Sequence, residues 1–270
     1  MSLFILIPIL FFGAILISSL GSISGVGGGV LFVPLLTMLL SNEGSDIKFI
    51  STVLVFVGSL FNVIFGLIRK EISFLVIGIS LVFSIPFVLL GNYLSDLISE
   101  TISQIIVIIF LIIVTILLIL SEYVFKHKDN NIVVSSNWYT IRTKDSSINL
   151  FKLITIIILG SLITAITGMG GGPILMPLLL LWVGLSMKGS APISHIIIAC
   201  TSLVNIIINY SMFQNTEIMI NYILPMTIGV IIGSVIVVFV KKYIKNEIII
   251  KWILISLIWI SVLKMIIDLF

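Results

Sequence analysis

Charged side chains are scarce in this chain of 270 residues: Lys, Arg, Asp and Glu make up 9% of it, whereas hydrophobic residues make up 60%. Soluble domains carry roughly 25% charged residues. The interior of a soluble fold of this length is too small to hold so much apolar surface. The composition therefore excludes a soluble protein and predicts a multi-pass protein of the cell membrane. Its apolar runs approach or exceed about 18 residues, which predicts an all-α fold and not a barrel of short strands.

Cysteine and histidine are also rare. The one cysteine, Cys200, excludes an intrachain disulfide and is interpreted as a small buried packing residue. The two histidines, His127 and His195, are too few for the ligand set of a membrane metalloprotease. No serine in the apolar segments stands near a His or Lys in a G-x-S-x-G-like setting. We expect no enzymatic activity, no catalytic residue, no metal, no cofactor and no nucleic-acid partner.

Charged residues are missing from four apolar segments in particular. These segments have no internal Asp, Glu, Lys or Arg, and they lie at about 49–68, 74–94, 192–213 and 218–240. A cation transporter or a proton pump normally needs buried carboxylates, so their absence argues against both classes. The glycine-rich strings of the chain also lack the spacing and the Gly-Lys-Ser/Thr ending of nucleotide-binding loops.

What the chain does have is ten apolar segments, five on each side of a polar stretch. They lie at about 3–20, 26–40, 49–68, 74–94, 103–121, 151–167, 173–187, 192–213, 218–240 and 248–269. We expect a first membrane repeat over 1–121, a cytoplasmic polar loop over 122–150 and a second membrane repeat over 151–270. The first 20 residues lack a basic start and a clear cleavage site, which favours a retained helix over a signal peptide.

The two halves align without a gap at an offset of 143 residues, from Gly21 to Asn62. The polar, glycine and proline matches are Gly25, Gly27, Gly28, Gly29, Pro34, Ser51, Ser59 and Asn62 with Gly168, Gly170, Gly171, Gly172, Pro177, Ser194, Ser202 and Asn205. Identities of these types in register are rare in an apolar composition. They indicate an internal duplication, a pattern found in membrane transporters.

The placement of Lys and Arg predicts the orientation of the two halves. If each glycine-centred pair of segments enters and leaves on one side, 12 of the 14 Lys and Arg residues share one face. Only Lys48 and Lys264 then fall on the other, and the 122–150 loop is cytoplasmic by the positive-inside rule. Five segments per half is an odd number, so we predict two inverted repeats. Each pair spans fully or forms a Gly-broken, re-entrant hairpin, and second members of about 15 residues favour the hairpin.

Glycines gather in two strings, "SGVGGGVLFVP" from Ser24 and "TGMGGGPILMP" from Thr167. Such glycines can break a helix and expose backbone N–H groups, while the helix that follows points its positive end at the break. This arrangement favours an anion. The alternative is that the glycines serve only close helix packing. The glycines predicted to bind the anion are Gly25, Gly27, Gly28, Gly29, Gly168, Gly170, Gly171 and Gly172.

Hydroxyl and amide side chains accompany the glycines at equivalent positions. Ser59 and Asn62 are three residues apart and share a helical face, as do Ser202 and Asn205. Interhelical hydrogen bonding is the alternative role for such side chains. His195 is either a proton or anion contact or an interfacial residue near the membrane edge. The side chains predicted to line the anion site are Ser24, Ser59, Asn62, Thr167, Ser202 and Asn205.

The doubled G-x-G-G-G…P motif, one copy in each half of a duplicated chain, resembles the TauE/SafE family of sulfite and organosulfonate exporters. The resemblance covers nearly the whole length. It implies a membrane permease for small sulfur-containing anions such as sulfite, thiosulfate or sulfoacetate. Carried over by position, the motif residues are Gly25, Gly27, Gly28, Gly29 and Pro34, with Gly168, Gly170, Gly171, Gly172 and Pro177.

We therefore expect a secondary transporter that exports a small anion by alternating access around a midplane site. Its partners would be the anion, the lipid bilayer and a coupling proton or sodium ion, because the chain has no ATP-binding motif. Two alternatives stay open. One is an anion channel on the same scaffold, and the other is a membrane scaffold protein that recruits a partner through the 122–150 loop.

Overall fold

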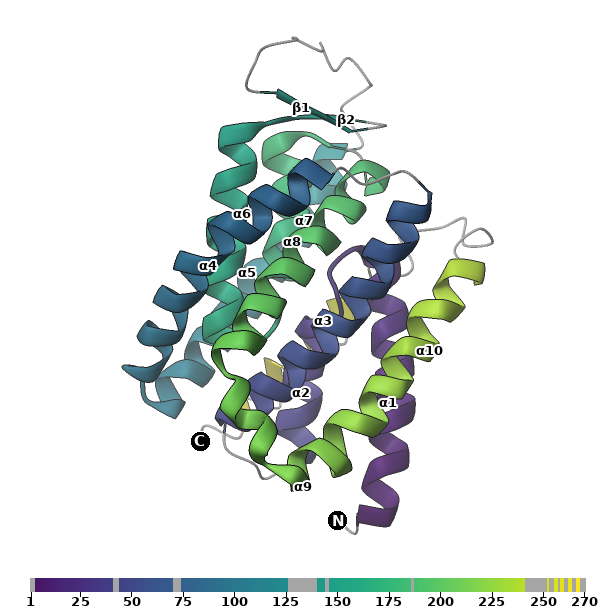
Figure 1. The fold of residues 1–270 in the computed structure, drawn as a ribbon, viewed down its shortest axis with the longest axis vertical. Coiled ribbons are helices and arrows are strands. Elements are labelled where there is room, and N and C mark those ends of the chain that lie inside the picture. Colours follow the sequence, from purple (N-terminus) through teal and green to yellow (C-terminus); the bar gives the residue numbers. More distant parts are fainter. Residues whose placement is uncertain are drawn as a thin grey trace.

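The computed structural model describes residues 3–40, 44–69, 74–125, 140–143, 146–185 and 187–240, with positions 252, 255, 256, 258, 259, 262, 263, 266 and 267. Figure 1 shows these residues as a bundle of helices with one short strand hairpin at one end. The first half holds α1 (Leu3–Ser24), α2 (Gly29–Leu39), α3 (Gly44–Ile68), α4 (Phe74–Asp96) and α5 (Glu100–Phe125). Then follow β1 (Thr140–Thr143), β2 (Ser146–Asn149), α6 (Leu150–Thr167), α7 (Gly172–Leu178), a π-helical turn η1 (Leu179–Val183), α8 (Met187–Ile208), a 3-10 turn η2 (Tyr210–Gln214), α9 (Thr216–Ile218), a π-helical turn η3 (Met219–Ile223) and α10 (Leu224–Val240).

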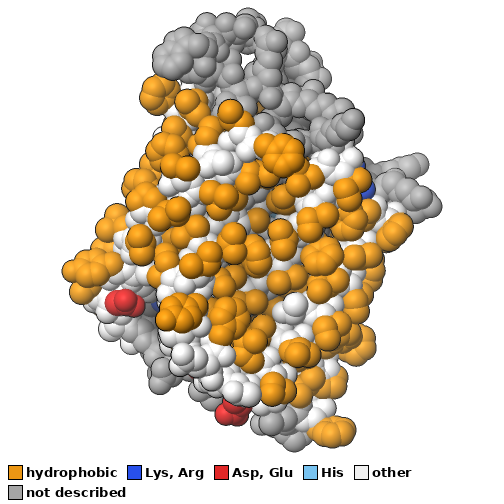
Figure 2. Space-filling view, in the orientation of Figure 1, with side chains coloured by type: hydrophobic (Ala, Val, Ile, Leu, Met, Phe, Trp, Pro, Cys, Tyr) orange, Lys and Arg blue, Asp and Glu red, His pale blue; other side chains and the backbone are white. Residues whose placement is uncertain are grey.

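Helices long and apolar enough to cross a membrane dominate the described part of the chain. There are six of them: Phe4–Ser24, Gly44–Ile68, Phe74–Asp96, Leu150–Thr167, Gly189–Ile208 and Thr216–Val240. Their outer faces expose large apolar side chains, which cover most of the face seen in Figure 2. An apolar surface of this extent is favourable against lipid and not against water. The prediction of an all-α, multi-pass membrane protein is confirmed.

The second member of each glycine-centred pair is too short to cross the membrane. Helix α2 has 11 residues, and α7 with η1 has 12, the sum of 7 and 5. At 1.5 Å per residue each reaches roughly 17 Å, against a hydrocarbon core of about 30 Å. Each pair is therefore a helix followed by a half-length helix, the Gly-broken hairpin favoured by the sequence.

The polar stretch between the halves differs from the expected plain loop. Helix α5 continues to Phe125, so the loop begins later than the expected boundary at 122. Strands β1 and β2 then pair antiparallel, with Thr140 opposite Asn149. The side chain of Asn149 accepts a hydrogen bond from the Phe151 N–H at 2.9 Å and so caps α6. Residues 126–139 and most of the segment expected at 248–269 lie outside the described residues.

Outer helices of one half pack on outer helices of the other. Ser18 on α1 donates a 2.9 Å hydrogen bond to the carbonyl oxygen of Val230 on α10, and its oxygen lies 2.9 Å from that of Ser234. On the other side of the bundle, Gly91 of α4 lies against Ala165 of α6. Small residues permit this close approach. The pairs α1–α10 and α4–α6 in Figure 1 thus each combine one helix from each half.

Helices α3 and α8, equivalent under the 143-residue offset, form the centre of the bundle and run antiparallel. The Asn205 side-chain nitrogen, late in α8, lies 3.5 Å from the Thr52 hydroxyl, early in α3. Ten residues further along α3, Asn62 lines the same pocket as His195, ten residues earlier in α8. The beginning of each helix therefore lies beside the end of its counterpart.

Candidate functional site

Both glycine strings break the helix, and they do so in the same conformation. Gly25, Gly27 and Gly28 have φ angles of 73°, 81° and 73°. Their equivalents Gly168, Gly170 and Gly171 have φ angles of 71°, 76° and 68°. These are left-handed values that residues with a Cβ rarely adopt. Helices α2 and α7 begin directly after the breaks, at Gly29 and Gly172.

The two breaks pack directly against each other. A Cβ atom on Gly29 would overlap the carbonyl oxygen of Met169, and a Cβ atom on Gly172 would overlap that of Val26. Val26 and Met169 are equivalent under the 143-residue offset, so the contact is made twice, once in each direction. Each break thus contacts the other through equivalent residues. These glycines do serve close packing, at the point where the breaks meet.

Serine hydroxyl groups donate hydrogen bonds to a backbone carbonyl oxygen in each break. Ser194 on α8 donates a hydrogen bond to the carbonyl oxygen of Gly25 at 2.8 Å. Its equivalent Ser51 on α3 donates one to the carbonyl oxygen of Gly168 at 2.9 Å. Polar backbone inside the hydrocarbon layer is stable only when it is satisfied in this way. Both serines are fully buried, and each comes from the half opposite to the break that it supports.

The predicted residues Ser24 and Thr167 support their own breaks. The Val26 N–H donates to the Ser24 hydroxyl at 3.4 Å, and the Met169 N–H donates to the Thr167 hydroxyl at 3.2 Å. Both are local hydroxyl turns that span two residues. Their hydroxyl oxygens are thus engaged in holding the breaks.

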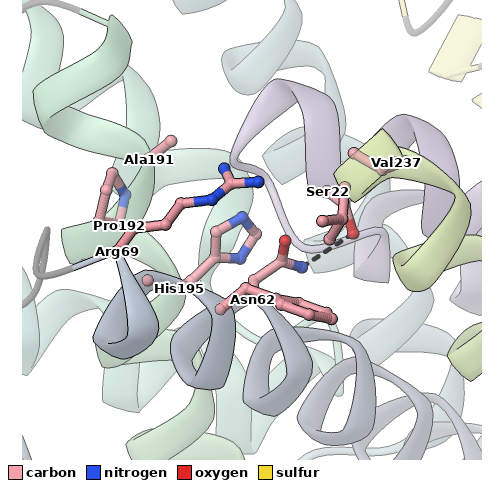
Figure 3. A pocket seen from close by; sticks show the side chains of 10 residues that line it. Ser22, Asn62, Arg69, Ala191, Pro192, His195 and Val237 are labelled. Atoms are coloured by element: carbon pink, nitrogen blue, oxygen red, sulfur yellow. Dashed lines mark hydrogen bonds between the residues drawn. The ribbon is translucent and has the colours of Figure 1, made fainter. Parts of the chain in front are cut away.

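A pocket adjoins the first break, and it collects polar groups from both halves (Figure 3). Its cavity has a volume of about 40 Å³ and is open at its mouth. Figure 3 shows the side chains of Arg69, His195 and Asn62 turned toward this space. Asn62 donates hydrogen bonds to the Ser22 hydroxyl and to the Gly58 carbonyl oxygen, both at 2.8 Å. The residues that line the pocket are Ser22, Asn62, Phe65, Gly66, Arg69, Ala191, Pro192, His195, Val237 and Val238.

Four helices position these side chains. The end of α1 supplies Ser22, just before the break. The last turns of α3 supply Asn62, and Arg69 follows directly after the end of α3. The first turns of α8 supply His195, which is 4% exposed, and the end of α10 supplies the apolar wall. Ala191 on the pocket wall also lies against Gly25, which connects the pocket to the break.

The candidate residues of α3 and α8 lie at three different places in the bundle. Asn62 and His195 are brought together in the pocket. Ser59 lies one turn deeper, beside Gly27, and its equivalent is Ser202. Both hydroxyls are fully buried and have no hydrogen-bond partner within the described part of the chain. Asn205 lies at the far end of α8 and contacts Thr52 and Asn92, away from the pocket.

Arg69 and Ser22 are pocket residues that the sequence did not indicate as such. In the sequence, Arg69 is only one of 12 cations predicted on the cytoplasmic side. The spacing does carry a signal, because Arg69 follows Asn62 by seven residues and hence shares its helical face. The sequence holds no such signal for Ser22, because the equivalent residue in the second half is Ala165.

The chemistry of the pocket suits an anion. The guanidinium of Arg69 presents a fork of N–H donors that matches an oxyanion, and Asn62 and Ser22 add neutral donors. No carboxylate is present among the described residues that line the space. The second break meets the first at the contact between Gly172 and Val26.

A family model described as sulfite exporter TauE/SafE matches residues 10–265, nearly the whole chain. No curated protein and no solved structure matches the chain. The matched region contains both glycine breaks, the pocket and, among the described helices long enough to cross the membrane, all but the first six residues of the first one. The chain belongs to the TauE/SafE sulfite exporter family, and it is thus a membrane transporter of sulfur compounds.

Proposed function

We propose that this protein is a secondary transporter that exports a small sulfur oxyanion or organosulfonate, such as sulfite, and that the Arg69 pocket binds it. The observation that carries the proposal is the convergence of Arg69, His195 and Asn62 in a pocket without a carboxylate. Sulfite and sulfonate groups present several oxygens that accept hydrogen bonds. A guanidinium with neutral donors beside it is well matched to them.

We infer that the two halves are inverted repeats and that they work by alternating access. Support comes from the antiparallel course of α3 and α8, which are equivalent in sequence. The N-terminus and the β1–β2 hairpin lie at opposite ends in Figure 1, so α1 and α6 start from opposite ends as well. The mutual contacts of the two breaks supply the approximate two-fold axis. A transport path that is open at one side of the membrane can then open at the other side, when the second half rearranges as the first half does.

The position of the pocket is consistent with export as the direction of transport. The pocket lies at the end of α3 and the beginning of α8, the same end as the β1–β2 hairpin (Figure 1). This is the end that the positive-inside rule assigns to the cytoplasm. An anion therefore enters the pocket from the cytoplasm, as an exporter requires. Coupling to a proton or sodium gradient, or downhill release, completes the cycle.

The test is sulfite flux from proteoliposomes that contain the purified protein. Arg69→Gln should lower the apparent affinity roughly ten- to a hundredfold, because one charge-assisted hydrogen-bonding group is lost. Lys152→Gln is the matched control, since Lys152 has the same charge at the same end but bonds to the Trp182 carbonyl oxygen outside the pocket. Equal flux in the parent and in Arg69→Gln would overturn the assignment of the pocket. Flux that rises linearly without saturation would indicate an anion channel instead.

A further inference from the structure

One face of α3 carries a line of residues that runs from one end of the helix to the other. The members are three, four or seven residues apart, which places them on a common face. They are Lys48, Thr52, Val55, Ser59, Asn62 and Arg69. Lys48 and Arg69 are separated by roughly 30 Å along the helix, close to the thickness of the hydrocarbon core. The two cations therefore mark opposite ends of one path.

The Lys48 end is the counterpart of the pocket under the 143-residue offset. Asn205 stands where the pocket has Asn62, and Thr52 stands where it has His195. Lys48 itself stands where the pocket wall has Ala191. Both ends thus present a cation and neutral hydrogen-bond donors from α3 and α8.

The two ends differ in what the polar groups contact. At the Lys48 end, α4 lies across the polar groups. Asn92 on α4 donates a 2.7 Å hydrogen bond to the Asn205 side-chain oxygen and accepts one of 3.0 Å from Asn209. Ser95, one turn later, accepts a 3.0 Å hydrogen bond from Lys48 Nζ. Side chains of α4 therefore cover this end.

The pocket end cannot form the same closure. At the pocket end, α10 contributes Val237 and Val238, and the residue of α3 equivalent to Asn209 is Gly66. None of these three residues offers a side-chain amide that could bridge Asn62. The described side chains at the two ends therefore differ in whether they can form this closure.

Between the two ends lies an apolar contact. Val55 on α3 lies against Gly170, and its equivalent Ile198 on α8 lies against Gly27. Both side chains are buried. They separate the pocket from the Lys48 end at the level of the two breaks.

We propose that Lys48, Thr52 and Asn205 form a second anion half-site, the counterpart of the Arg69 pocket, and that Asn92 on α4 closes it in this structure. The proposal rests on the proposed transport function. When α4 moves away from α8, the two asparagine hydrogen bonds and the Lys48–Ser95 hydrogen bond break. The ammonium group and the amide then face the anion. Helix α6 moves with α4, because Gly91 and Ala165 hold the two in close contact.

The closure is tested by thiol labelling in the full-length protein. The background is Cys200→Ser, and the reporter is Thr52→Cys, which is fully buried in the closed end. A membrane-impermeant maleimide is added from the side opposite the Arg69 pocket, without any anion substrate. Asn92→Ala should speed labelling roughly tenfold, since two hydrogen bonds that hold the closed end are lost. Ser95→Ala should also speed the labelling, by a smaller factor.

Val235→Ala is the control, because Val235 lies on α10 and takes no part in the hydrogen bonds of the Lys48 end. Labelling that is no faster in Asn92→Ala and Ser95→Ala than in Val235→Ala would overturn the closure. Size-exclusion chromatography of each variant establishes that it is folded before labelling. Two variants with independent contacts keep the test decisive if one of them does not fold.

The half-site is tested by whether a bound anion protects Thr52→Cys from the maleimide. Sulfoacetate should slow the labelling of Thr52→Cys in the Asn92→Ala background at least threefold, and Lys48→Gln should abolish the protection while Lys48→Arg retains it. Protection that persists in Lys48→Gln would overturn the half-site. Flux and labelling separate the two proposals. A parent protein without flux but with labelling that depends on Asn92 would overturn the proposed function and support the closure.

Discussion

The hydroxyl of Ser194 donates a 2.8 Å hydrogen bond to the carbonyl oxygen of Gly25, which belongs to the other half of the chain. The equivalent hydrogen bond from Ser51 to Gly168 measures 2.9 Å. Each half thus stabilises the broken backbone of the other. Neither break could be satisfied in this way by its own repeat alone, which explains why a duplicated chain keeps both serines and both glycine strings.

Removing either serine should weaken the fold by a similar amount. Ser51→Ala and Ser194→Ala each leave a buried carbonyl oxygen without its side-chain donor, a loss of about 1–3 kcal/mol. The measurement is the free energy of unfolding in detergent micelles under denaturant. Thr155→Ala is the control, because the Thr155 hydrogen bond is exposed and local, and the change in stability there should be within about 0.5 kcal/mol. A much larger effect of one serine than of the other would contradict the equivalence of the two breaks.

A methyl group at the contact between the breaks should not be tolerated. Gly29→Ala and Gly172→Ala place a Cβ atom into the carbonyl oxygens of Met169 and Val26. We expect a loss of about 3 kcal/mol or more, seen as aggregation or a lower Tm. Gly78→Ala is the matched control, since Gly78 lies in α4 with open space around its Cβ direction. That variant should be as stable as the parent or up to about 1 kcal/mol more stable, because alanine favours the helix. A normal Tm in Gly172→Ala would refute the tight contact.

A negative charge in the pocket should prevent anion binding while the fold persists. Asn62→Asp replaces an amide donor by a carboxylate beside Arg69 and Ser22. Sulfite flux should fall at least tenfold, because the carboxylate repels the anion and competes for the guanidinium. Asn62→Ala removes the amide without adding charge, and it should lower flux less. Equal loss in both variants would point to packing and not to charge.

The orientation of the bundle can be measured independently of transport. In a Cys200→Ser background, Phe151→Cys at the start of α6 should be labelled from the cytoplasmic side. Gln214→Cys, after the end of α8, should be labelled from the opposite side. Both native side chains are exposed. The expectation follows from the excess of Lys and Arg near the β1–β2 hairpin. Reversed labelling would make the Arg69 pocket face outward and would reverse the proposed direction of transport.

Much of the fold could be predicted from local properties of the chain. Long apolar segments predict helices across a membrane, because the cost of exposing backbone to hydrocarbon leaves few alternatives. The glycine strings predict helix breaks, and the φ angles from Gly25 to Gly28 and from Gly168 to Gly171 confirm them. The β1–β2 hairpin was not predicted, because two strands of four residues carry little periodic signal.

The sequence by itself determined the membrane class, the duplication and the positions of the two breaks. Only the tertiary structure decided which residues meet. It brought Arg69 into the pocket with His195, and it separated Asn62 from Asn205, although the sequence grouped these two in one site. It also gave a role to Asn92, which no motif indicated. The physical reason is that periodicity specifies the face of a helix on which a residue lies, whereas its partner depends on which helices of the two halves pack together and in which direction.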